Sequence, residues 1–303
     1  MAEAVVGTGA PSPGVDRAAA RQRKSFLRVF IERNKVGMIG YVIFGAILIM
    51  SFIGPLFLPD ENPTDVGLVY APPSWDHPLG TDWRGQDVLY QIINGGAGLL
   101  IVSMIAAGVA TAVAVIFGAL AGLIGGRLDS VALILADVVL TVPFIILLGV
   151  LAVFVRLDNI FLLALVLAAV GWPTLLRAVR AQVLSLKERE YVEAARMLDL
   201  PMRHVLFREV LPNMMPYIII NFVLGMTNAI YGQIILYYLG LVPLQGDNWG
   251  LMIQQIQSKQ AYSLNDAFVY VMAPIVMISL LQLSLVLISR TLEDVFNPRL
   301  REV

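Results

Sequence analysis

Six long apolar stretches, nearly free of charged residues, constrain this chain more than any other feature of its sequence. A helix needs about 20 apolar residues to cross the roughly 30 Å hydrocarbon layer of a bilayer, and each stretch can supply one crossing. We therefore predict an all-α, polytopic membrane protein with six transmembrane helices. The expected spans cover residues 36–59, 96–125, 130–155, 159–178, 213–238 and 267–289.

The second span belongs to a charge-free run, 88–126, that is too long for one straight crossing. We expect a short surface helix at the start of this run. Gly95 and Gly96 are adjacent glycines, a signal for a break, and are the expected joint between the surface helix and the span.

The composition excludes several other classes of protein. Of the 303 residues, 58% are hydrophobic and 14% are charged, whereas soluble domains have roughly 45–50% and 25%. The formal net charge of −1 provides no basic field for a nucleic acid. The chain has no cysteine and only two histidines, so disulfides and thiol nucleophiles are excluded. His77 lies near Asp76 and Asp82, a pattern that favours a loop contact over a metal site.

The basic residues predict the orientation of the spans. With six crossings, both termini lie on one side of the membrane. That side then carries all of the 21 Lys and Arg residues except Arg84, Arg156 and Lys259. Because Lys and Arg accumulate in cytoplasmic segments, we expect both termini to be cytoplasmic.

The most informative cytoplasmic segment covers residues 185–211. Its charged, helix-forming sequence predicts one helix ending near Leu200, before Pro201, and a second from about Met202 towards Pro212. In the first helix Val192, Ala195 and Leu198 share a face. One interpretation is a helix lying on the bilayer surface. The interpretation we favour is a docking element for a soluble partner, since surface anchors carry more bulky apolar residues and fewer carboxylates.

Six motifs are distributed over roughly residues 35–301. These are Glu193-Ala194-Ala195, Leu211-Pro212-Asn213, the segment His77-Pro78-Leu79-Gly80-Thr81-Asp82 with Gly85, Asp87 and Val88, Arg127-Leu128-Asp129, Trp172-Pro173 and Asn297-Pro298-Arg299-Leu300. In the order and spacing of these motifs, the sequence resembles the inner-membrane permease subunits of ATP-binding-cassette importers, in the dipeptide and oligopeptide group. Asp199 stands where that family has a glycine, and Asp is one of the few residues that tolerates the positive φ that glycine allows.

The resemblance implies a permease subunit in the inner or plasma membrane of a prokaryote, in contact with membrane lipid and with no nucleic-acid partner. The implied partners are a second homologous permease, two ATP-binding subunits and an extracytoplasmic solute-binding protein that delivers peptides. Alternatives are the same machinery importing oligosaccharides, nickel or glutathione, or, in a different class, an ion-coupled secondary transporter. The implied regions are a disordered cytoplasmic tail (1–20), a basic flank with the first span and an external segment (21–95), and a five-helix permease core with a coupling loop at 185–211 (96–303).

The resemblance implies no catalytic, cofactor or metal residue on this chain. No Gly-x-x-x-x-Gly-Lys-Ser/Thr motif occurs, so we expect ATP and Mg²⁺ to be bound by the partner subunits, which hydrolyse the ATP. The residues implied to couple this chain to those subunits are Glu193, Ala194, Ala195, Arg196, Asp199, Leu211 and Pro212.

Four polar residues within the spans are candidates for lining a translocation pathway: Asp137, Asn221, Asn228 and Gln233. An intramembrane carboxylate such as Asp137 either lines a pathway or pairs with Arg177 or Arg180. Asn221 and Asn228 are seven residues apart, nearly on one helix face. Their amides serve either a hydrated path or hydrogen bonds between helices.

Overall fold

The computed structural model describes residues 35–243 and 246–296. Within these residues the regular secondary structure is helical, apart from one isolated bridge between Thr81 and Asp87. The expected tail (1–20), most of the basic flank and the Asn297–Leu300 motif lie outside the described residues. The main helices are α2 (Lys35–Phe52), α3 (Val88–Ile124), α4 (Gly126–Thr141), α5 (Phe144–Phe154), α6 (Ile160–Leu186), α7 (Glu190–Met197), α8 (Met202–His204), α9 (Leu211–Tyr238), α10 (Trp249–Ser258) and α11 (Phe268–Phe296). A π-helix, Val205–Val210, joins α8 to α9, and 3₁₀ turns cover Gly54–Phe57, Val66–Leu68 and Ala261–Ser263.

Four described helical stretches are long and apolar enough to cross a membrane: 88–124, 160–186, 202–238 and 268–296. Helices α4 and α5 make a fifth candidate if the bent pair is counted as one span, and α2 is a shorter apolar helix. These findings confirm an all-helical, polytopic membrane protein.

Two of the expected spans differ from the prediction because of proline. The first helix ends at Phe52 rather than near residue 59, and a 3₁₀ turn, Gly54–Phe57, follows with Pro55 as its second residue. The expected span 130–155 is not one continuous helix, since α4 and α5 meet at an angle of 94°. Val142 is extended at φ −86° and ψ 130°, because a residue preceding a proline, here Pro143, is disfavoured in the α region.

The expected break between a surface helix and a span at Gly95 and Gly96 is wrong, because α3 runs through both glycines without interruption. The glycines instead permit close packing. A Cβ atom on Gly95 would lie 2.9 Å from the Trp249 ring, and one on Gly96 would lie within 2.9 Å of Trp249 and Ser51. Trp249 is fully buried, and its indole N–H donates to the carbonyl of Ile92 at 2.8 Å.

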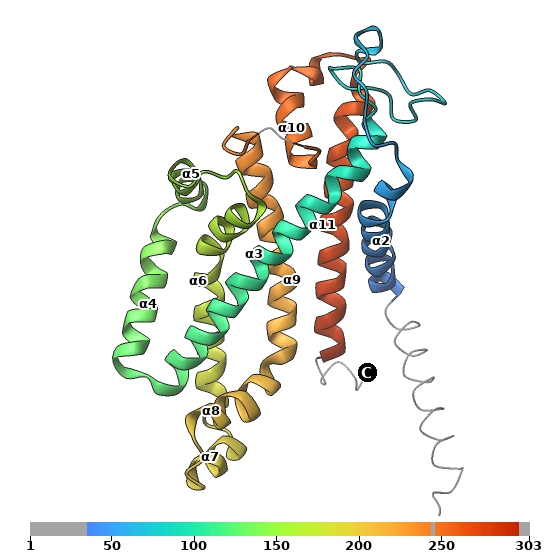
Figure 1. Cartoon of the computed structure of the whole chain (residues 1–303). Helices are drawn as coiled ribbons and strands as arrows, with labels where there is room; N and C mark the ends of the chain where they lie inside the picture. Colours follow the sequence, from blue (N-terminus) through green and yellow to red (C-terminus); the bar gives the residue numbers. More distant parts are fainter. Residues whose placement is uncertain (1–34, 244–245, 297–303) are drawn as a thin grey trace, which may run out of the picture.

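Helix α3 lies at the centre of the bundle and packs against α2, α6 and α9 (Figure 1). One apolar cluster joins α3 to α2, α9, α10 and α11. At the opposite end of the molecule from α10, a second cluster joins α3, α6 and α9 to α7 and the π-helix. The segments that protrude from the two ends of the bundle are therefore both anchored on α3.

Candidate functional site

We call α7 and the turn that follows it the coupling segment. It lies next to α8 and the C-terminal end of α6, at the opposite end of the molecule from α10 (Figure 1). Val192 and Ala195 are buried in the cluster that contains Val205 and Leu206 and reaches Val183 on α6. Glu193 and Ala194 are exposed. The predicted amphipathic pattern therefore fixes α7 on the bundle through one face and presents Glu193 outwards.

Leu198 is a correction to that pattern, because it is 72% exposed rather than packed with Val192 and Ala195. The helix ends at Met197, and Asp199 adopts the left-handed conformation with φ 49°. The amide of Leu200 donates to the carbonyl of Ala195 at 3.2 Å. This bond and the left-handed residue form a Schellman C-cap, in which Asp199 takes the place that glycine usually holds. The predicted tolerance of positive φ at Asp199 is confirmed.

The coupling segment and the π-helix region that follows it expose five large apolar side chains. We call this set the tip surface. Met197 is 78% exposed and Phe207 is 64% exposed. Exposed apolar patches of this kind mark interaction sites. The tip surface consists of Tyr191, Met197, Leu198, Met202 and Phe207.

The remaining predicted coupling residues lie beside the tip surface. The side chain of Arg196 is outside the described part of the structure. Leu211 packs against the cluster that buries α7, and Pro212 is exposed in the first turn of α9. The helix continues from Met202 through the π-helix to Tyr238, so the second helix expected in this segment and the fifth expected span are one element.

Two ion pairs join α4 to α6. Arg180 donates two hydrogen bonds to Asp129, one of them from Nη2 to Oδ2 at 2.6 Å, a bidentate geometry that is among the strongest between side chains. Asp137 pairs with Arg177, and both side chains are about half exposed. One of the two partners expected for Asp137 is therefore its partner in the structure.

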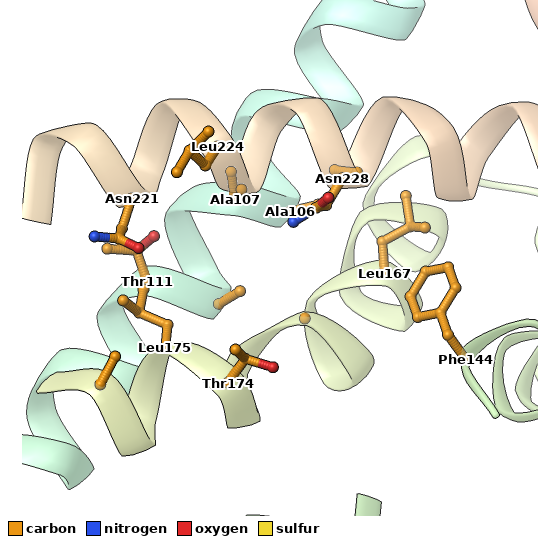
Figure 2. A pocket seen from close by; sticks show the side chains of 15 residues that line it. Ala106, Ala107, Thr111, Phe144, Leu167, Thr174, Leu175, Asn221, Leu224 and Asn228 are labelled. Carbon is orange, nitrogen blue, oxygen red and sulfur yellow. The ribbon is translucent and has the colours of Figure 1, made fainter. Parts of the chain in front are cut away.

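A cavity of about 260 Å³ lies between α3, α6 and α9 (Figure 2). Asn221 and Asn228 line it, whereas Asp137 and Gln233 do not. Figure 2 shows both asparagines on the cavity side of α9, with Thr111 of α3, Thr174 of α6 and Phe144 of α5 across from them. The other lining residues are Ala106, Ala107, Ala110, Leu167, Gly171, Leu175, Ala178, Leu224, Gly225 and Ala229.

The three predicted amides differ in their hydrogen bonds. Asn221 donates from Nδ2 to the carbonyl of Tyr217, on the same helix, at 2.8 Å. Within the described residues, no hydrogen bond is assigned to the Asn228 side chain, which is exposed. Gln233 is fully buried, and its Nε2 donates to the carbonyl of Leu99 on α3 at 3.2 Å. Among these three amides, the hydrogen bond between helices is made by Gln233, whereas the bond of Asn221 stays within α9.

Sequence reasoning did not identify the residues that α3 and α6 contribute to the cavity. Thr111 and Thr174 are single hydroxyls in apolar helices, and their neighbours are alanines and glycines that also suit ordinary helix packing. The available signal is a stripe of small residues at helical spacing, such as Ala106 and Ala110. That stripe becomes informative only when the packing partners are known.

The His77–Val88 motif forms a structural network between α2 and α3. Asp82 is buried, and its carboxylate accepts hydrogen bonds from the amides of Arg84 and Gln86 and from Gln91 Nε2, at 2.7–2.9 Å. Asp87 caps α3 by accepting from the amide of Tyr90 at 2.8 Å. Its second oxygen contacts His77 Nδ1 at 2.8 Å, as the expected loop contact requires.

Charges surround this network at the α10 end of the bundle. Two cations lie over the Trp83 ring: Lys259, whose Nζ is 4.1 Å from the ring centroid, and Arg84, whose Cζ is 5.0 Å from it. Desolvation raises the pKa of the Asp247 carboxyl, against the lowering effects of the Arg84 charge and a hydrogen bond from Asn94. No group of three His, Cys, Asp or Glu side chains among the described residues could hold a metal ion.

Comparison with known proteins gives consistent matches. Residues 114–302 match the family described as binding-protein-dependent transport system inner membrane component. Residues 22–73 match the N-terminal TM domain of oligopeptide transport permease C. A putative peptide permease protein of Brucella suis is 33% identical over 82% of each chain. In Bacillus subtilis, the oligopeptide transport system permease protein OppC is 34% identical over 72% of each chain. The dipeptide transport system permease protein DppC of that organism is 30% identical over 89% of this chain and 84% of its own.

Proposed function

Since this chain belongs to the family of inner membrane components of binding-protein-dependent transport systems, we propose that it is a permease subunit of an ATP-binding-cassette importer for dipeptides or oligopeptides. The observation that carries this function is that the same three helices line a cavity and hold the coupling segment. Helices α3, α6 and α9 surround the cavity, and their ends hold the exposed coupling segment. A transporter driven by separate subunits needs such a connection between a docking surface and a path.

The proposed topology has six crossings in the inner membrane, with both termini in the cytoplasm. Helix α2 has 18 residues and a length of about 27 Å at 1.5 Å per residue, close to the thickness of the hydrocarbon layer. The bent pair α4 and α5 supplies another crossing. The distribution of Lys and Arg supports this orientation, because Lys and Arg accumulate in cytoplasmic segments and the segment around α7 is rich in them.

The proposed assembly contains a second homologous permease, two ATP-binding subunits and an extracytoplasmic solute-binding protein. ATP and Mg²⁺ bind to the ATP-binding subunits, which dock on the tip surface around Glu193. Ala194, Arg196, Asp199 and Pro212 are proposed to belong to the same contact. Ala195 and Leu211 support it from within the bundle, where both pack in the cluster beneath α7.

The proposed mechanism transmits motion as a rigid body. ATP-driven closure of the two ATP-binding subunits moves both α7 helices. Because Val192 and Ala195 pack tightly against residues of α6 and the π-helix, α7 cannot move without those elements. The helices then change the access of the cavity from one side of the membrane to the other.

The test uses the complete transporter in proteoliposomes, with its partner permease, ATP-binding subunits and solute-binding protein. We expect ATP-dependent uptake of a radiolabelled tripeptide that depends on this chain. Uptake of an oligosaccharide or of nickel ions, with no uptake of any of a panel of peptides, would overturn the proposed substrate. Uptake that continues without ATP and follows an ion gradient would overturn the proposed class.

The coupling role is tested with Glu193→Lys. Reversal of the charge on the exposed face of α7 is expected to lower uptake at least about tenfold. The lysine would then face a like charge or an unpaired group on the ATP-binding subunit, where Glu193 makes the proposed docking contact. The ATPase activity should no longer respond to peptide, while the amount of chain in the membrane stays the same. Glu293→Lys on α11 makes the same charge change on an exposed residue outside the tip surface and is the matched control. Equal uptake by the two variants would refute the docking role.

A further inference from the structure

The helices around the cavity carry very few charged residues. Helices α3, α5 and α9 contain no Asp, Glu, Lys or Arg, and no lining residue of the cavity is ionisable. On α6 the two charged residues are Arg177 and Arg180. Arg177 is the nearer to the cavity in sequence, since it directly precedes the lining residue Ala178.

Both arginines are neutralised by carboxylates of α4. Arg180 is held by Asp129 through two hydrogen bonds, and Arg177 pairs with Asp137. The two acids are eight residues apart on α4, and the two arginines are three apart on α6. Each charge beside the cavity therefore has an opposite charge in contact, and the wall presents no net charge to a molecule inside.

The polar groups that do line the cavity are amides and hydroxyls. Asn221 and Asn228 stand two helical turns apart on α9, and Thr111 and Thr174 face the same space from α3 and α6 (Figure 2). An amide can donate and accept hydrogen bonds, and so can a hydroxyl. These groups match the N–H and C=O groups that every peptide bond carries, whatever its side chains.

From these observations we infer that this chain provides a neutral section of the translocation path, in which Asn221 and Asn228 form hydrogen bonds to the peptide groups of the cargo without selecting its charge. The inference rests on the proposed function. A fixed charge in the wall would attract cargo of opposite charge and repel cargo of like charge. Neutral amides avoid both effects, and their weak, repeated contacts let the cargo leave as well as enter.

The experiment measures uptake of Ala-Lys-Ala and Ala-Glu-Ala by the complete transporter in proteoliposomes. The ratio of the two rates is compared between variants and the unmodified chain, so that any preference of the solute-binding protein cancels. We expect Asn228→Asp to raise the Lys-to-Glu ratio at least about fivefold and Asn228→Lys to lower it by a similar factor. Asn221→Asp should act in the same direction as Asn228→Asp. Asn213→Asp, on α9 but outside the cavity lining, should leave the ratio unchanged.

A second readout separates contact with cargo from damage to the fold. Asn228→Leu, which removes the hydrogen-bonding group, should lower uptake of both peptides and of Ala-Ala-Ala by one common factor. Normal membrane levels are checked by immunoblot. Ratios that stay constant in all three charged variants of Asn221 and Asn228, with the variants inserted and active, would overturn this inference and leave the proposed function intact. An unmodified transporter that takes up none of the three peptides, and no dipeptide or longer peptide of the panel used to test the proposed function, would instead overturn the proposed function.

Discussion

The substitution Gly96→Ala adds one methyl group at the most crowded point of α3. A Cβ atom there would lie only 2.0 Å from Ser51 Oγ and 2.9 Å from both Ser51 Cβ and the Trp249 ring. Trp249 has little room to move, because it is fully buried and donates a hydrogen bond to Ile92. We expect the neighbouring helices α2 and α10 to be forced away from α3. The control is Gly98→Ala on the same helix, where the nearest atom would be 3.8 Å away, in ordinary contact.

The magnitude follows from the comparison of these two variants. Both gain about 1 kcal/mol of helix propensity when alanine replaces glycine, so this contribution cancels between them. Overpacking at Gly96 costs about 1–3 kcal/mol, which corresponds to a lower unfolding midpoint by roughly 2–4 °C for each kcal/mol. The assay is thermal unfolding of the purified transporter in detergent. Adding Ser51→Gly to Gly96→Ala should restore part of the loss. Equal midpoints for Gly96→Ala and Gly98→Ala would refute the packing role and favour a flexible joint.

Two further predictions concern the turn after α7 and the ion pair between α4 and α6. Asp199→Gly should keep full uptake, since glycine accepts φ 49° freely, whereas Asp199→Val should reduce uptake and lower stability by about 1–2 kcal/mol. Loss of uptake in the glycine variant would show that the carboxylate itself makes a contact. Asp137→Asn leaves Arg177 without its partner, so we expect the double variant Asp137→Asn/Arg177→Gln to transport better than the single one. A double variant that is inserted normally but inactive would indicate that the pair acts directly in transport.

The positions of most helices could be predicted from the sequence because apolar length is a local property. The expected spans 96–125, 159–178, 213–238 and 267–289 all lie within helices of the structure or overlap them almost completely. The errors occurred where a local signal has two physical outcomes. A pair of glycines can break a helix, or it can let another element pack closely against the helix. At Gly95 and Gly96 the second outcome is found, because the buried ring of Trp249 packs against them. Pro143 bends its segment by 94°, whereas Pro173, Pro216 and Pro274 lie inside continuous helices.

The candidate site could be predicted only in part, because it depends on which faces of different helices meet. Asn221 and Asn228 share a face of α9 by their spacing, and both line the cavity. Gln233 is five residues beyond Asn228, about 140° away around the helix, and therefore points to α3. Likewise, Leu198 continues the spacing of Val192 and Ala195, but the helix ends before it. A periodic pattern predicts a shared face only as far as the helix extends.

The cavity and the coupling segment are connected by side chains that are close in sequence on each helix. Leu175 of α6 both lines the cavity and packs against the cluster beneath α7. On α3, Thr111 in the cavity lies one turn from Val115 in the cluster, and on α9, Asn221 bonds to Tyr217, which packs there. One helical turn is about 5.4 Å, and a close-packed interior passes on such displacements instead of absorbing them. In the proposed mechanism, a movement of α7 therefore reaches the cavity walls through one layer of side chains on each of the three helices, and docking of the proposed partner at the tip surface changes the access to the cavity.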